Sequence, residues 1–494
     1  MKATSWKRRS SATLGGWGME FNWPKVRLGD HVDSCLGKML DKQKNKGVEQ
    51  PYLGNSNVRW GEFDLSDLAQ MKFEEHEHER YGIKPGDLIV CEGGEPGRCA
   101  IWEGELPEMK IQKALHRVRA KPSFNNRYLY YWFLYAGQHG LLEPYFTGTT
   151  IKHLSGRALS NLVLPQPPIG HQEFMASILG SIDKKIQLNH RINNTLQQMA
   201  QALFKSWFVD FDPVKAKVSV LEAGGSDMDA LLAAMEAISG KTADQLALLR
   251  TEQSERFAEL RATAALFPSA MQESELGEIP EGWEVTSIGK IAEVIKGKSY
   301  KSAELSSSNT ALVTLKSFNR GGGYRLDGLK EYTGKYKPKQ EVFAGDLIIA
   351  YTDVTQAADV IGKPALVVSD SRYEHLVVSL DVAVIRPFEE KLKPYLYGLA
   401  GTDGFQSHTR AYTTGTTVLH LDKNAVPDYQ FSMPSKALAE AYERQVSPLF
   451  SLIDQKIQEA RSLASLRDTL LPELLSGELE APSAETKIAE VANA

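Results

Sequence analysis

The sequence predicts an internally duplicated α+β chain with two mixed, mostly-β domains and two long helices. Three observations predict this fold. An ordered set of segments recurs after about 260 residues, the first part of each copy is rich in short β-forming runs, and each copy ends in a stretch with helical apolar spacing. At 494 residues the chain has room for roughly two to four domains.

The repeat consists of matching segments that keep their order. Trp23–Gly29 recurs as Trp283–Gly289 at an offset of 260, and Tyr145–Thr150 recurs as Tyr412–Thr417 at an offset of 267. The offsets differ only by short insertions. The sequence therefore establishes two copies of one unit without reference to any known protein.

Each copy begins with short β-rich runs, such as Leu88–Val90 and Ala365–Val368, which glycine turns separate. Each β-rich part ends at prolines, Pro165–Pro168 in the first copy and Met433–Pro434 in the second. The predicted segments are an N-terminal extension (1–22), a first domain (23–168), a central helical region and linker (169–282), a second domain (283–435), a C-terminal helical region (436–480) and a tail predicted to be disordered (481–494).

The two long helices have the 3-4 spacing of coiled-coil strands. The first seam is Leu179, Ile182, Ile186, Asn189, Asn193, Leu196, Ala200 and Leu203, and the second is Leu449, Ile453, Ile457, Ala460, Leu463, Leu466 and Leu470. Asparagines in a seam lower stability but can fix register and partner choice. The alternative is two unrelated amphipathic helices, each lying on its own domain.

An aromatic segment follows the first helix. Its members are Phe204, Trp207, Phe208 and Phe211. Four aromatic rings in eight residues are not expected to remain exposed to water. They therefore either dock another subunit or cap the core of the helices. Further along, 219–228 is predicted to be a flexible loop and 229–265 a helical hairpin.

Composition and charge exclude several classes of protein. No run approaches 18 apolar residues, so no membrane span is expected, and three cysteines suit a reducing cytosol. The net charge of −5 is unevenly distributed: it is +4 for 1–168, −6 for 169–282, +1 for 283–435 and −4 for 436–494. The two β-rich domains could therefore approach an anionic polymer, while the acidic helical regions favour protein partners.

The common motifs of catalytic and cofactor sites are missing. The sequence has no GxGxxG, GxxxxGK[ST], GxSxG or HExxH, and no [DNS]PP[YFW] of the kind amino-methyltransferases use. Asp87 with Glu108 and Lys110 has the spacing of a nuclease site, and Glu74–Glu79 has HxH spacing, but a turn and a solvated charged face explain them more simply. We therefore predict no catalytic residue, metal or cofactor in this chain.

The repeated TGTT-x-x-HL element is a candidate DNA-binding site. Its glycines permit a tight backbone approach, and its hydroxyls, histidines and one lysine could contact phosphates or bases. The candidates are Thr147, Gly148, Thr149, Thr150, Lys152 and His153 in the first copy, and Thr414, Gly415, Thr416, Thr417 and His420 in the second. The alternative is a turn into the last strand, with the hydroxyls as local caps.

A polar loop in each copy is the second candidate. Residues 55–61 align roughly with 316–322, and amide and cationic side chains on such a loop suit the reading of base edges. The candidates are Asn55, Asn57 and Arg59, and Lys316, Asn319 and Arg320. The residues of the two loops differ, while the segments around them match. One scaffold with two different reading surfaces is what a protein that reads two different half-sites requires. The alternative is an ordinary polar loop.

With these elements the chain resembles the specificity subunits of type I restriction–modification systems. The resemblance is carried by the TGTT-x-x-HL element, the PxPP segment before the first helix, the run Ala202–Phe211 and the run Ser274–Trp283. It extends from about Trp23 to Leu479, nearly the whole chain.

The resemblance implies two target-recognition domains held apart by antiparallel helices, each domain reading one half of a split, asymmetric site in double-stranded DNA. It implies that the helices set the spacer and dock two modification subunits, which bind S-adenosylmethionine and methylate adenine. Restriction subunits would add ATP- and Mg²⁺-dependent translocation and cleavage. The implied location is the cytoplasm, with no membrane partner. The alternatives are a reader from a fused methyltransferase or nuclease enzyme, and a duplicated protein-binding scaffold without a DNA role.

Overall fold

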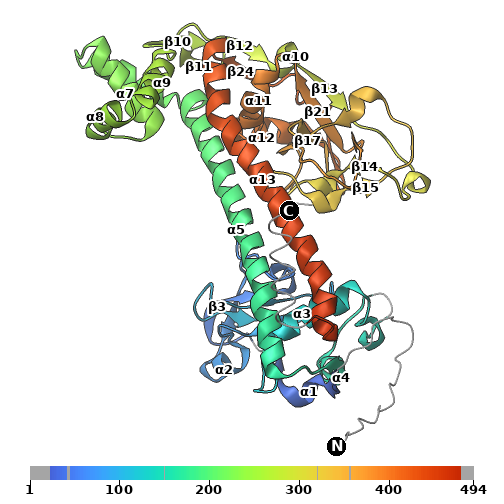
Figure 1. Ribbon diagram of the computed structural model, residues 1–494. Coiled ribbons are helices and arrows are strands. Elements are labelled where there is room, and N and C mark those ends of the chain that lie inside the picture. Colours follow the sequence, from blue (N-terminus) through green and yellow to red (C-terminus); the bar gives the residue numbers. More distant parts are fainter. Residues whose placement is uncertain (1–22, 42–44, 149–150, 320, 355–357, 480–494) are drawn as a thin grey trace, which may run out of the picture. The chain divides into compact units, whose positions relative to one another are not determined.

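The structure is a computed structural model that describes residues 23–41, 45–148, 151–319, 321–354 and 358–479. It divides into two compact units: the described residues up to Leu188 together with those from Glu459 onward, and residues Asn189–Gln458. The long helices α5 (Ile169–Phe208) and α13 (Lys436–Ser476), green and red in Figure 1, contribute to both units. Within the described ranges, no helix combines the length and hydropathy needed to cross a bilayer.

The first unit is organised around a four-stranded sheet with the strand order β2-β8-β5-β6. Beside it, β3 pairs with β4 and runs parallel to β7, and β1 pairs with β9. Its elements are β1 (Lys25–Arg27), α1 (Leu28–His31), β2 (Val32–Leu36), β3 (Val48–Leu53), β4 (Gln70–Phe73), α2 (His78–Tyr81), β5 (Leu88–Cys91), β6 (Cys99–Ile101), β7 (Lys110–Ile111), β8 (Leu115–Ala120), α3 (Asn126–Gln138), α4 (Gly156–Asn161) and β9 (Val163–Pro165).

The second unit repeats this topology. One of its two four-stranded sheets has the order β13-β21-β17-β19, which matches β2-β8-β5-β6. The strand β12 pairs with β24 as β1 does with β9, and β14 runs parallel to β20 as β3 does to β7. The elements are β10 (Met271–Ser274), β11 (Gly277–Pro280), β12 (Glu284–Ser287), α10 (Ile288–Ile291), β13 (Ala292–Lys296), β14 (Thr310–Val313), β15 (Lys330–Glu331), β16 (Glu341–Val342), β17 (Leu347–Ala350), β18 (Thr352–Asp353), β19 (Pro364–Leu366), β20 (His375–Val378), β21 (Val382–Pro387), α11 (Lys393–Ala400), α12 (Asp403–Ala411), β22 (Thr413–Thr414), β23 (Leu419–Leu421) and β24 (Gln430–Met433). The predicted duplication and α+β class are confirmed.

Between α5 and β10 the chain forms α6 (Asp212–Glu222), α7 (Asp227–Ser239), α8 (Ala243–Glu252) and α9 (Ser254–Ala265). The predicted flexible loop at 219–228 is therefore wrong, because α6 extends through its first half and α7 begins within it. Ser226 caps α7: its hydroxyl accepts from the Asp229 N–H at 3.3 Å, and the Asp229 carboxylate accepts from the Ser226 N–H at 3.0 Å. The predicted helical hairpin is a group of three helices.

The long helices pair antiparallel within each unit. In the first unit Arg467 of α13 donates to Asp183 of α5 at 2.9 Å. In the second unit the Tyr442 hydroxyl of α13 donates to the Ala200 carbonyl of α5 at 3.2 Å. The predicted α5 seam is buried or half-buried throughout, including Asn189 at 0% exposure. This pairing confirms the predicted coiled coil.

The buried imidazole of His116 predicts a pH dependence of stability. His116 lies in β8 at 1% exposure, with Nε2 2.9 Å from the Leu154 carbonyl. Burial lowers its pKa, against the smaller opposing effects of that hydrogen bond and of Glu92. The unfolded chain therefore takes up this proton more readily, and stability is lost as pH falls below about 6.5 toward the lower folded pKa.

We expect the melting temperature of the full chain to fall between pH 7.5 and 5.5, and to fall less in His116→Gln, which has no imidazole to protonate. Thermal unfolding followed by circular dichroism measures both. Equal decreases in the two proteins would show that His116 does not contribute.

Candidate nucleic-acid interface

The first threonine and the histidine of the TGTT-x-x-HL element pair in the same antiparallel way in both domains. In the first domain the backbone groups of Thr147 and His153 exchange two hydrogen bonds, of 2.9 and 2.8 Å. In the second, Thr414 of β22 faces His420 of β23. Each threonine hydroxyl also donates to the carbonyl of its histidine partner, at 3.3 and 3.4 Å. The repeated motif thus has a structural role in closing the hairpin, as one of the two predicted alternatives proposed.

The glycines of this motif are required by the turn itself. Gly148 has φ 93° and Gly415 has φ 109°. A Cβ on Gly148 would lie 2.2 Å from the Ile151 carbonyl oxygen, and a Cβ on Gly415 would lie 2.1 Å from that of Val418. Only a residue without a side chain fits either place.

We expect Gly415→Ala to lower the free energy of unfolding of the second unit by about 1–3 kcal/mol, because it adds backbone strain and the clash with Val418. The matched control is Gly345→Ala. Gly345 also has positive φ, at 84°, but a Cβ there would meet nothing within 4 Å. The Gly345→Ala variant should therefore lose less free energy of unfolding. Urea denaturation measures both, and equal losses would exclude the clash as a cause.

The hairpins leave exposed the side chains that could meet DNA. Thr416, Thr417 and His420 are exposed in the second domain, as are Lys152 and His153 in the first. Thr149 and Thr150 lie outside the described residues. The Lys152 ammonium is 3.6 Å from the Glu143 carboxylate, in an ion pair exposed enough to be weak. DNA contact by these side chains stays a prediction.

Asn57 does not belong to an exposed reading surface. Its side chain accepts from the Gly54 N–H at 2.9 Å and donates to the Asp64 and Asp67 carbonyls at 3.0 Å each, and the residue is 8% exposed. All its polar atoms hold the loop together, because a buried amide without partners would be costly. The predicted DNA contact at Asn57 is therefore corrected to a structural cap.

This cap also corrects the loop alignment between the domains. In the second domain the Ser317 hydroxyl accepts from the Thr314 N–H at 3.2 Å, as Asn57 does from Gly54. Asn57 therefore corresponds to Ser317 rather than to Phe318, one residue from the alignment that the sequence suggested.

The other loop candidates differ in accessibility. Lys316 and Asn319 are exposed, and Arg320 lies outside the described residues. The Arg59 side chain is 40% exposed and lies 3.5 Å from Asp64. Asn55 is half-buried. Lys316, Asn319 and Arg59 thus have side chains that a duplex could reach.

A glycine-containing turn connects the two candidate segments of the first domain. This turn, 92–98, joins β5 to β6. The Arg98 guanidinium donates to the Asn55 carbonyl at 3.0 Å, and the Trp60 indole donates to Glu95 at 2.7 Å. On the other side, the Leu154 N–H donates to the Glu92 carbonyl at 2.7 Å. The polar loop and the hairpin therefore meet at one turn.

The second domain has the same arrangement around the segment between β17 and β19. The Gly321 N–H donates to the Asp359 carbonyl at 3.2 Å, which ties the polar loop to this segment. Thr352 of β18 pairs with His420, and the Leu421 N–H donates to the Tyr351 carbonyl at 2.9 Å, which ties the hairpin to it. Such contacts between distant segments have no signature in the sequence.

The aromatic segment at the C-terminal end of α5 fills the core of the second unit: Phe204, Trp207 and Phe208 belong to the last turns of the helix, and Phe211 follows it. Phe204 and Trp207 are 0% exposed and Phe208 is 5% exposed, while Phe211 is half-buried against Trp283, with ring centroids 5.6 Å apart. The interpretation of these residues as a partner-docking surface is therefore corrected: they cap the core of the helices.

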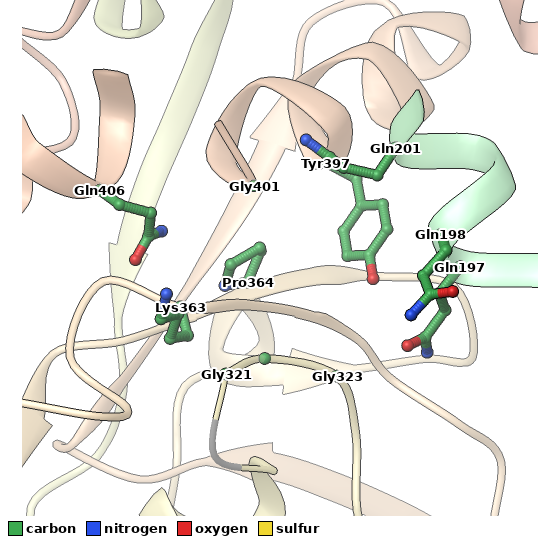
Figure 2. Close-up of a pocket in the computed structure, with 11 residues that line it drawn as sticks. Gln197, Gln198, Gln201, Gly321, Gly323, Lys363, Pro364, Tyr397, Gly401 and Gln406 are labelled. Atoms are coloured by element: carbon green, nitrogen blue, oxygen red, sulfur yellow. The ribbon is translucent and has the colours of Figure 1, made fainter. Parts of the chain in front are cut away.

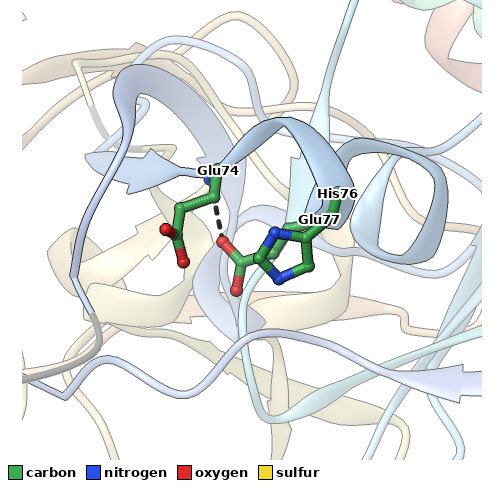
Figure 3. A group of neighbouring side chains, drawn as sticks. All are labelled: Glu74, His76 and Glu77. Atoms are coloured by element: carbon green, nitrogen blue, oxygen red, sulfur yellow. Dashed lines mark hydrogen bonds between the residues drawn. The ribbon is translucent and has the colours of Figure 1, made fainter.

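The charged residues with nuclease-like or HxH spacing have structural roles. In Figure 3, Glu74, His76 and Glu77 surround a short turn in which the Glu77 carboxylate accepts from the Glu74 N–H at 2.9 Å. Burial opposes ionisation of Glu77, but hydrogen bonds from Lys38 and the Glu74 backbone outweigh it and hold its pKa below the usual value. The Asp87 carboxylate accepts from Arg119 at 2.7 and 2.9 Å and from the Lys84 N–H at 2.8 Å, as a turn cap does.

Comparison with known proteins identifies the family. The family described as type I restriction modification DNA specificity domain matches residues 20–198. The HindI type I restriction enzyme specificity subunit of Haemophilus influenzae is 31% identical over 340 residues, which cover 67% of this chain and 72% of the relative. The MjaIX specificity subunit of Methanocaldococcus jannaschii is 23% identical over 407 residues, 80% of this chain and 78% of the relative.

Among solved structures, the S subunit of a type I restriction–modification system from M. genitalium is similar at 14% identity and a TM-score of 0.44, covering 92% of this chain and 96% of that chain. The extent and identity of the match to the Haemophilus subunit establish the relationship. The chain belongs to the family of type I restriction enzyme specificity subunits.

Proposed function

We propose that this chain reads DNA for a type I restriction–modification complex, with each domain binding one half of a split, asymmetric duplex site. One observation carries the proposal. The two domains share a topology and tie the hairpin to the connection between corresponding sheet strands, β5 to β6 or β17 to β19, but they differ in the exposed side chains of the polar loop. The first loop presents Arg59, and the second presents Lys316 and Asn319. Such side chains suit phosphate contacts and the reading of base edges.

The chemistry of the complex would lie in other subunits. Two modification subunits would bind S-adenosylmethionine and methylate adenine, and restriction subunits would use ATP and Mg²⁺ for translocation and cleavage. The missing catalytic and cofactor motifs support this division of labour. The long helices would set the spacer between half-sites, and the net charge of −6 over 169–282 supports this region as a docking surface for protein rather than DNA.

The test is the methylome of a cell that expresses this chain together with its modification subunits. A split adenine-methylated motif, absent when the chain is omitted, is the expected result. The pure chain incubated with labelled S-adenosylmethionine and duplex should transfer no methyl group. Transfer by the chain alone would favour a fused enzyme, and no sequence-dependent methylation in the complete system would favour a scaffold without a DNA role.

A further inference from the structure

One cationic position is shared by the two domains but used differently. The Cys91 N–H donates to the Arg98 carbonyl at 2.7 Å, and the Ala350 N–H donates to the Lys363 carbonyl at 3.2 Å. These equivalent bonds close the segment after β5 in the first domain and after β17 in the second. Arg98 and Lys363 therefore occupy corresponding positions, each immediately before the next strand of the sheet.

The first domain uses its cation internally. The Arg98 guanidinium donates to the Glu95 carboxylate and the Asn55 carbonyl, at 3.0 Å each, and its side chain is 16% exposed. Lys363 is half-buried, and its ammonium forms no ion pair or hydrogen bond with any residue that the structure describes. A cation partly removed from water without an anionic partner is unfavourable, so this difference needs an explanation.

Lys363 borders a cavity of about 190 Å³ within the second unit. Figure 2 shows Gln197 and Gln198 of α5 on one side, Lys363 and Gln406 on the other, and the loop Gly321–Gly323 below. Glutamine side chains, Lys363 and the glycine backbone make up the polar part of the lining, and Pro364 and Tyr397 complete it.

The cavity is open because glycines stand where the first domain has tryptophan. Gly61 and Gly323 hold the two loops to the sheet in the same way. The Gly61 N–H donates to the carbonyl of Cys99, the first residue of β6, and the Gly323 N–H donates to that of Pro364, the first residue of β19, at 3.0 Å each. Just before this glycine the first loop has Trp60, which packs against the core of its unit, while the second loop has Gly321 and Gly322. Among the residues that the structure describes, the second loop thus has no side chain at this place, where the first loop has the Trp60 ring.

The position of Lys363 is fixed by its neighbours. The Gln406 amide, 9% exposed, donates to the Gly362 carbonyl at 2.9 Å and the Ala400 carbonyl at 2.7 Å. Gly362 has φ 73°, and a Cβ there would lie 2.4 Å from the Thr409 hydroxyl. The backbone that presents the lysine is therefore held by buried contacts.

The electrostatic surroundings favour an anion beside the ammonium. Burial lowers the pKa of Lys363, and Arg410 lowers it further, while the smaller effects of Asp403 and Asp359 raise it. An anion in the cavity would compensate the lost hydration of the ammonium, and the Gln197 and Gln198 amides could donate hydrogen bonds to it. A DNA phosphate has the required charge and oxygen acceptors.

We propose that this cavity binds one backbone phosphate of the half-site read by the second domain, through Lys363, and that the first domain has no equivalent contact. The inference rests on the proposed function and deepens it: the two domains would share a fold but differ in their backbone contacts. Because a phosphate contact positions the duplex without reading it, its loss should weaken binding to all sequences alike.

The test uses the full chain in complex with its modification subunits. Binding to a duplex with the methylated motif is measured by fluorescence anisotropy between about 50 and 200 mM salt. In this range the slope of log K against log salt reports the number of phosphate contacts. Lys363→Gln should make the slope of log K against log salt less negative by about 0.9. Lys363→Arg should retain the wild-type slope. Lys335→Gln removes the same charge from an exposed site of the same domain and should leave the slope unchanged.

Duplexes with a single neutral methylphosphonate linkage then locate the contact. At one linkage of the second half-site, the substitution should weaken wild-type binding but not that of Lys363→Gln. An unchanged slope with wild-type melting temperature, or loss of discrimination at one base pair, would overturn the phosphate assignment. If the wild-type complex prefers no split site, the proposed function fails, while the slopes on random duplex still decide whether Lys363 contacts phosphate.

Discussion

Replacing Phe204 with alanine is expected to lower the free energy of unfolding of the second unit by about 3–5 kcal/mol. The ring is 0% exposed, and its centroid lies 5.1 Å from that of Phe208, 5.2 Å from Tyr395 and 5.7 Å from Tyr442. The truncation removes buried apolar area and leaves a cavity that aromatic neighbours cannot easily fill. Urea denaturation of the full chain, followed by tryptophan fluorescence, measures the change.

The matched control for this truncation is Val209→Ala. Val209 follows the end of α5 and is 42% exposed, so its loss should cost much less than that of Phe204. Similar effects of the two substitutions would mean that the aromatic segment does not form the core of this unit, and would restore its interpretation as a docking surface.

Replacing both Lys316 and Arg320 with alanine is expected to damage recognition of one half-site only. If either side chain makes a bidentate contact to guanine, discrimination at one position should fall by about 1–3 kcal/mol. If both touch only phosphate, affinity should drop uniformly and the salt slope should shrink by about one per contact. Binding by the complex to duplexes with single changes in either half distinguishes these results.

The first half-site serves as the internal control, because it is assigned to the other domain. Lys337→Ala, at an exposed position of the second domain outside this loop, should leave discrimination in both halves unchanged. Equal loss of discrimination in the two halves after the double substitution would contradict independent reading by the two domains.

The repeat and the long helices were predictable because their signals lie along the chain. Matching segments at nearly constant offsets predict matching strand orders, which the sheets β2-β8-β5-β6 and β13-β21-β17-β19 have. Apolar residues at 3-4 spacing predict a buried helical stripe whatever lies opposite, and the α5 seam is buried or half-buried as expected. Periodicity thus determined the architecture.

The candidate site was predictable only in part. The sequence located the hairpins and polar loops, but Asn57 is a buried cap and Phe204, Trp207 and Phe208 are core residues. Polar and aromatic side chains suit both an interface and an interior. Which of the two they enter depends on partners far away in the sequence, such as Tyr395 and Tyr442 for Phe204.

The sequence by itself determined the duplicated fold, the coiled-coil seams and the glycines of the hairpins. Only the tertiary structure decided which side chains remain exposed and how the turn at 92–98 joins loop to hairpin. It also decided that Arg98 is paired, whereas Lys363 meets no partner among the described residues. The physical reason is that secondary structure follows local spacing, whereas burial and pairing are set by contacts between residues that the chain brings together only when it folds.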